Sequence, residues 1–155
     1  MMKEMIGQGV IIDEGVGRFL KETIIPIRIA CATESAWPLV VSLWYTFSDG
    51  AIYCATQNSA KLVRYLRNEP RCGFEVASEI PPYRGVRGQG IARIDKSRGR
   101  EILEILLDRY GIGRNSSLGK VLLSKSDEVA IEIQPARLFN WDYTRRMRDS
   151  LTQQC

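Results

Sequence analysis

Histidine is absent from this sequence of 155 residues. The imidazole ring is the usual general base of enzymes, the commonest zinc ligand and a member of most catalytic triads. Its absence argues against hydrolases that use such a triad and against most metalloenzymes. We therefore predict no metal site, and no residue stands out as catalytic.

Cysteine pairs and long apolar runs are also lacking. The four cysteines show no Cys-x-x-Cys spacing, and Cys31, Cys54 and Cys72 lie singly in strand-like runs, where a thiol behaves as a small apolar side chain. We predict reduced, buried thiols. The fourth cysteine, Cys155, is the last residue of the sequence. No run approaches the roughly 20 apolar residues that span a bilayer, and charge interrupts the N-terminal stretch from Met1 to Met5. These features predict a cytoplasmic protein without a membrane segment.

The composition is that of a chain able to bury its own core. Hydrophobic residues make up 45% and charged residues 26%, which favours a single domain over residues 1–155. The net charge of +4 indicates an anionic partner, such as a cofactor or a nucleic acid, or simply a basic surface. Because the basic residues are dispersed rather than interleaved with aromatic ones, a nucleic acid is the least favoured of these.

Strand-like runs dominate the chain and alternate with short amphipathic segments. Ser48-Asp49-Gly50 predicts a hairpin turn between two of the runs. The sequence predicts a mainly β, antiparallel fold with peripheral helices. The predicted helices cover residues 13–22, 59–69 and 100–110, and the predicted strands cover residues 24–33, 38–47, 51–56, 71–77, 86–94 and 128–141.

The segment from Thr56 to Lys61 lies where a predicted strand ends and a predicted helix begins. Helix N-terminal amides carry partial positive charge, the hydroxyls of Thr56 and Ser59 can donate hydrogen bonds, and Lys61 adds a full charge. This segment is suited to a phosphate monoester. The alternative is that Asn58 or Ser59 only caps the helix and Lys61 is solvated.

Six segments stand in an order that resembles the FMN-binding split barrel of the pyridoxamine-phosphate oxidases. The last of them carries the Pro-to-Trp spacing of that family's Pro-x-Arg-Ile-Glu-Phe-Trp segment. The segments are Ser48-Asp49-Gly50, Ile52 to Ala55, Thr56 to Lys61, Asn68 to Arg71, Arg84 to Ala92, and Pro135 to Trp141.

The resemblance implies an antiparallel, Greek-key-like split β-barrel and a homodimer with FMN at the subunit interface. It implies that Ser59 and Lys61 hold the phosphate, that the flavin ring lies along Val41 to Thr46, and that Trp141 reaches the partner's flavin. For Trp141 the alternative is an ordinary half-buried aromatic residue. The implied cofactor-binding residues are Ser42, Leu43, Trp44, Tyr45, Ala55, Thr56, Ser59, Ala60, Lys61, Arg84, Gln89 and Trp141.

Two departures from the family concern its substrate and its flavin ring. The segment Arg146-Met147-Arg148-Asp149-Ser150 stands where the oxidases have Arg-Leu-His-Asp-Arg. Arg146 and Arg148 are candidate substrate-binding residues, or else part of a solvated basic tail. Gly85 replaces a flavin-binding Gln, although Gln89 on the same predicted strand can face a similar region.

We therefore predict an FMN-binding oxidoreductase that acts on a small molecule other than pyridoxamine phosphate. The flavin would carry the chemistry, which agrees with the lack of histidine. The alternatives are a non-catalytic flavin-binding or redox-sensing module, and a deazaflavin-dependent reductase. A haem-handling function, as in some relatives, is less favoured, because no histidine exists to ligate the iron.

Overall fold

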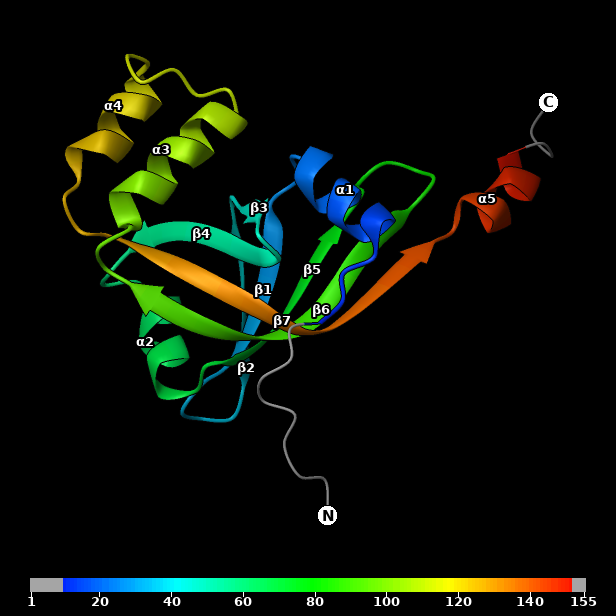
Figure 1. Ribbon diagram of the computed structural model, residues 1–155, viewed down its shortest axis with the longest axis horizontal. Helices are drawn as coiled ribbons and strands as arrows, with labels where there is room; N and C mark the ends of the chain where they lie inside the picture. Colours follow the sequence, from blue (N-terminus) through cyan, green and yellow to red (C-terminus); the bar gives the residue numbers. More distant parts are fainter. Residues whose placement is uncertain (1–9, 152–155) are drawn as a thin grey trace.

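The computed structural model describes residues 10–151, and their side chains through residue 148. The predictions for Met1 to Met5 and for Cys155 concern residues outside this range. The described chain forms a curled seven-stranded sheet with helices around it (Figure 1). The strands are β1 (Ile27–Ala32), β2 (Pro38–Leu43), β3 (Thr46–Ser48), β4 (Ala51–Gln57), β5 (Arg71–Ala77), β6 (Arg84–Asp95) and β7 (Glu128–Asp142).

The strand order across the sheet is β2-β1-β5-β6-β7-β4-β3, and every neighbouring pair is antiparallel. β2 and β3 are consecutive in the chain but lie at opposite edges of the sheet. The sheet is therefore a barrel wall that stays open between β2 on one side and β3 and β4 on the other. The predicted mainly β, antiparallel fold with peripheral helices is confirmed.

β7 joins the two halves of the sheet. It pairs with β4 from Glu128 to Ile133 and with β6 from Ala130 to Asp142. The register with β6 shifts between Gln89 and Gly90, where Ala136 of β7 has no partner on β6, an irregularity typical of a β-bulge. Beyond the bulge, β7 runs away from the barrel and ends beside α5 (Figure 1).

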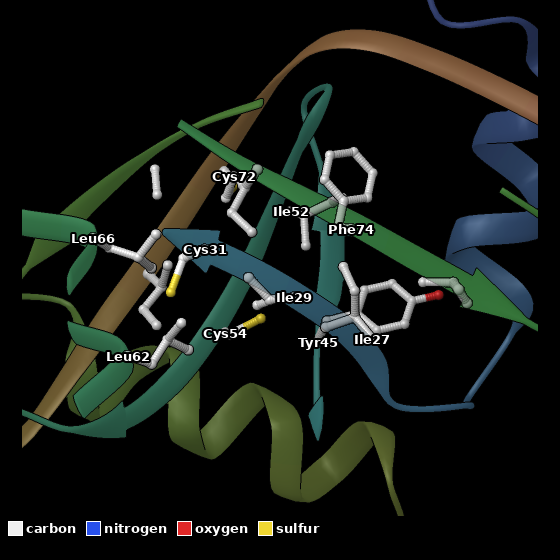
Figure 2. Close-up of a cluster of buried hydrophobic side chains, with 14 of the residues drawn as sticks. Ile27, Ile29, Cys31, Tyr45, Ile52, Cys54, Leu62, Leu66, Cys72 and Phe74 are labelled. Atoms are coloured by element: carbon white, nitrogen blue, oxygen red, sulfur yellow. The ribbon is translucent and has the colours of Figure 1, made fainter. Parts of the chain in front are cut away.

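The core lies inside the curled sheet. Alternation along β1 points Ile27, Ile29 and Cys31 inward. Figure 2 shows these side chains together with residues of β4, β5 and α2. Cys31, Cys54 and Cys72 are buried and free, as predicted.

The three predicted helices are present as α1 (Glu14–Glu22), α2 (Lys61–Asn68) and α3 (Gly99–Arg109). Asp13 caps α1 as predicted, because its Oδ1 accepts the backbone N–H groups of Gly15 at 2.9 Å and Val16 at 3.3 Å. The turn at Ser48-Asp49-Gly50 is also confirmed, with positive φ of 51° at Asp49 and 77° at Gly50.

Three features differ from the sequence-based predictions. The strand predicted over 38–47 breaks after Leu43, because Tyr45 turns into the core and the chain crosses from the β1 edge to β4. The helices α4 (Ser117–Ser124) and α5 (Thr144–Leu151) were not predicted. α3 and α4 lie side by side next to β4 in Figure 1. No helix of the described residues is long and apolar enough to cross a membrane.

Candidate functional site

A cavity of about 390 Å³ lies in the opening between β2 and β4. It brings together five of the residues predicted to bind the cofactor, namely Ser42, Leu43, Trp44, Ala55 and Thr56. The volume is within the range of small-molecule sites, roughly 300–1,000 Å³. The other lining residues are Pro26, Gln57, Leu103, Leu106, Leu122, Lys125 and Glu128.

The strand edges at this cavity carry unpaired backbone groups. Among the described residues, β2 pairs with β1 alone, and β4 beyond Tyr53 pairs with β7 alone. The backbone of an edge strand offers a row of N–H donors and C=O acceptors. The cavity can therefore bind the polar edge of a ring through the main chain.

One wall of the cavity is apolar and fixed in place by α3. Trp44 stacks on Tyr110 with ring centroids 5.1 Å apart and an interplanar angle of 16°. Both rings pack against Ile102, Leu106 and Ala130 in a small second core. This rigid aromatic wall suits a flat, apolar ligand.

A polar end of the cavity is formed by three neighbouring side chains, those of Gln57, Lys125 and Glu128. Gln57 Nε2 donates a hydrogen bond to Glu128 Oε1, and Lys125 lies on the same lining. Burial raises the pKa of Glu128, while Gln57 and Lys125 oppose that rise. The cavity thus has one end where charge and protonation can respond to a ligand.

The turn that follows β4 leads to the N-terminus of α2. The N-cap is Ala60, and no side chain of the described residues caps the helix. Asn58 Oδ1 instead accepts a hydrogen bond from Arg67 Nη2 at 2.6 Å. The alternative that Asn58 or Ser59 only caps α2 is therefore contradicted. Ser59 and Lys61 are exposed at this end, so an anion can reach them.

Tyr45 does not line the cavity. Its side chain is fully buried, and its hydroxyl donates to the carbonyl oxygens of Leu20 at 2.9 Å and Thr23 at 3.1 Å. It neighbours Trp44 in sequence but points to the other side of the chain, into the core. The structure thus gives Tyr45 a structural role in the core.

Arg84 and Trp141 line a separate crevice of about 210 Å³ beside α1. The Arg84 guanidinium lies 5.7 Å from the ring centroid of Phe19. The Trp141 indole packs against Gly85, where a Cβ atom would lie 2.9 Å from its Cζ2. Trp141 Nε1 is buried without a hydrogen-bond acceptor among the described residues. Within one chain, neither residue reaches the β2/β4 cavity.

Gln89, Arg146 and Arg148 also lie away from that cavity. Gln89 is exposed on the outer face of the sheet, where it borders hollows of about 550 and 480 Å³. Arg146 and Arg148 are exposed on α5, and the Arg146 guanidinium lies 5.6 Å from the ring centroid of Tyr143. The predicted site residues thus fall into separate groups within a single chain.

Sequence analysis missed the polar end of the cavity. Gln57 lies inside the Thr56 to Lys61 segment, and its neighbours there were assigned to phosphate. Lys125 and Glu128 reach the cavity only because α4 and β7 fold back beside β4. Their sequence gives no local pattern that marks a site.

Solved structures share this fold, although no family model and no curated protein matches the chain. A conserved hypothetical protein from Mycobacterium tuberculosis has a TM-score of 0.73 and 19% identity, covering 93% of this chain and 92% of its own. An F420 reductase has a TM-score of 0.69 and 19% identity, covering 83% and 98%. A candidate pyridoxamine 5'-phosphate oxidase from Listeria innocua has a TM-score of 0.58 and 13% identity, covering 74% and 86%. The chain has the split-barrel fold of pyridoxamine-phosphate-oxidase-like proteins, as its sequence predicted.

Proposed function

We propose that this chain binds FMN in the β2/β4 cavity and is an oxidoreductase that acts on a small molecule. The observation that carries the proposal is a juxtaposition. Five predicted cofactor-binding residues line one cavity, and β4, which forms its edge, leads directly to the uncapped N-terminus of α2 with Ser59 and Lys61. Reduced thiols in the core agree with a single-domain protein of the cytoplasm.

The residues fit both parts of the cofactor. The α2 amides, the Ser59 hydroxyl and the Lys61 ammonium would bind the phosphate. Trp44 and Leu106 would cover a face of the ring, and the unpaired backbone of β4 would bind its polar edge. A bound flavin supplies the redox chemistry, whereas the chain orients the ring and excludes water from it.

Two of the similar folds favour an oxidoreductase. One is an F420 reductase and the other is a candidate pyridoxamine 5'-phosphate oxidase. The same likeness keeps a deazaflavin as the alternative cofactor, and a non-catalytic redox-sensing module as the alternative function. Anaerobic reduction of the loaded protein, followed by reoxidation with candidate acceptors, separates a catalyst from a sensor. Competition between FMN and a deazaflavin identifies the preferred cofactor.

We also propose a homodimer with the flavin at its interface. Arg84, Gln89 and Trp141 do not line the cavity of their own chain, so in this proposal they act on the cavity of the partner. The outer face of the sheet supports such pairing, because it exposes large apolar side chains. These are Val40, Ile91 and Phe139, on β2, β6 and β7.

The substrate is proposed to be something other than pyridoxamine phosphate. Arg146 and Arg148 on α5 are the candidate substrate ligands, and Arg148 stands where the oxidases have histidine. A guanidinium is longer than an imidazole and accepts no hydrogen bond. We expect kcat/KM for pyridoxamine phosphate well below roughly ten thousand per molar per second, measured as pyridoxal phosphate formation by the FMN-loaded protein. A value above this limit would show a genuine oxidase.

The cofactor assignment is tested by a visible spectrum and by one substitution. The purified protein should show flavin absorption, and Lys61→Ala should weaken FMN binding by about 1–3 kcal/mol, because a charge-assisted phosphate contact is lost. Titration of apo-protein by fluorescence quenching measures this change. Riboflavin lacks the phosphate, so its weaker binding should be nearly unaffected by the substitution. An unchanged FMN dissociation constant would refute the phosphate site.

A further inference from the structure

Glu128 places a carboxyl group inside the β2/β4 cavity. Among the described residues that line the cavity, it alone is acidic. It is half-buried at the start of β7, opposite Gln57 in the β4 ladder. The chain has no histidine, so this carboxyl is the lining group best suited to exchange a proton below pH 8.

The partner of Glu128 is neutral. Its Oε1 accepts a hydrogen bond from the Gln57 amide, and none of the ion pairs between described residues includes it. The charged groups around it are Lys125 and Arg100, which favour the carboxylate, and Asp127, which disfavours it. Burial outweighs these influences and raises the pKa of Glu128.

We propose that Glu128 is the proton-exchanging group of this cavity and that FMN binds more tightly when Glu128 is protonated. The inference rests on the proposed function, since it places the flavin ring in the cavity. A flat ring that covers Glu128 removes its remaining water and offers no positive charge in return. Loss of water disfavours the charged form, so the neutral acid should persist in the complex.

The neutral acid also changes what the cavity can recognise. A carboxylate only accepts hydrogen bonds, whereas a protonated carboxyl can donate one. With Glu128 protonated, the polar end of the cavity presents an O–H donor from Glu128 beside the amide of Gln57. Such an end suits the carbonyl oxygens and ring nitrogens at the edge of a flavin.

The test compares FMN dissociation constants of wild type and Glu128→Gln between pH 5 and pH 8.5. The ratio of the two constants at each pH removes the titration of the FMN phosphate, which both proteins share. Wild-type binding should weaken relative to the variant as pH rises, by roughly tenfold for each unit by which the ligand raises the pKa. Glu132→Gln is the matched control, because Glu132 lies on the same strand, pairs with Arg93 and does not line the cavity. It should keep the wild-type pH profile.

A second variant, Gln57→Leu, tests the direction in which the pH dependence of FMN binding shifts. This substitution removes the hydrogen bond that favours the carboxylate, so the affinity of Gln57→Leu for FMN should fall at a higher pH than that of wild type. Calorimetry in two buffers of different ionisation enthalpy should detect more proton uptake on FMN binding by wild type than by Glu128→Gln, because the FMN phosphate contributes equally in both proteins. FMN binding with identical pH profiles in wild type and Glu128→Gln would overturn this inference and leave the proposed function standing. Failure of wild type to bind FMN at every pH would overturn both.

Discussion

Arg109 connects two helices through a single guanidinium. Its Nη1 donates to the carbonyl oxygen of Lys21 at 2.6 Å, and its Nη2 donates to those of Leu20 at 3.0 Å and Thr23 at 2.6 Å. These carbonyls form the C-terminal end of α1, where the helix dipole is negative. The guanidinium also lies 5.1 Å from the ring centroid of Tyr45. One side chain of α3 thus positions α1 and the strand break at Tyr45.

We predict that Arg109→Met lowers the free energy of unfolding by about 2–4 kcal/mol, because hydrogen bonds from a charged donor are lost and the Lys21 carbonyl loses its partner. Urea unfolding followed by circular dichroism measures the change. Arg18→Met is the control, since Arg18 pairs with Glu14 on an exposed face of α1 and should cost less than about 1 kcal/mol. Equal losses in the two variants would contradict the role given to Arg109.

At the level of single residues, the sequence predicted part of the cavity lining and not all of it. Ser42, Trp44 and Thr56 were predicted through the resemblance to the FMN-binding split barrel, and all three line the cavity. The resemblance assigned Tyr45 to the same site, but its side chain turns into the core. Glu128 was missed because its place depends on the pairing of β7 with β4, which joins residues 71 positions apart.

Two helical glycines differ sharply in what surrounds them. Gly17 lies in α1, where an added Cβ would meet Ile12 and Phe47 only at ordinary contact distances of 3.8 and 3.9 Å. Gly99 begins α3, where an added Cβ would collide with the backbone carbonyl of Glu128. The close approach at Gly99 docks α3 on β7, directly beside the cavity.

The same substitution should therefore have opposite effects in the two helices. Gly17→Ala should raise the free energy of unfolding by roughly 0.5–1 kcal/mol, because alanine restricts the unfolded chain and favours the helix. Gly99→Ala should lower it by about 1–3 kcal/mol, through strain in a packed interior. Thermal unfolding compares the two variants. Stabilisation by both would show that α3 can move away from β7 without cost.

Element boundaries followed local sequence where caps and turns were clear. Asp13 and the Ser48-Asp49-Gly50 turn mark α1 and the β3–β4 hairpin in the sequence itself. α4 was not predicted from its local sequence. Its packing depends on Gly119, whose backbone approaches the carbonyl of Gly113 in the preceding loop. Such a contact has no signature in the sequence of the helix.

The outer face of the sheet is the largest feature that a single chain leaves unexplained. One row across it runs from Val40 through Ala30 and Gly73 to Gln89. Val40 is 62% exposed, and Phe139 borders the same hollow of about 480 Å³. Small residues between large apolar ones make a surface that another chain can approach closely. The proposed homodimer would cover this face.

We predict that Val40→Glu yields a monomer that binds FMN poorly, because it places a charge in the proposed interface. Val121→Glu is the matched control, since Val121 is 55% exposed and belongs to α4, a helix that Figure 1 shows apart from β2. It should stay dimeric. Light scattering at micromolar concentration reports the mass of each variant, and FMN titration reports the site. A wild-type monomer that holds FMN would exclude the proposed assembly.

The three thiols inside the barrel report how often the sheet opens, through the rate at which a reagent modifies them. Burial raises the pKa of Cys54, Cys72 and Cys31, so a thiol reagent meets protonated, inaccessible sulfur atoms while the sheet is closed. Modification at these positions requires the strands to separate, so the modification rate reflects how often each strand separates from its neighbours. Thiol labelling followed by mass spectrometry would measure the opening rates of β1, β4 and β5 separately, at Cys31, Cys54 and Cys72, without an introduced probe. A ligand that bridges β2 and β4 should lower the modification rate at Cys54 more than at Cys31 or Cys72.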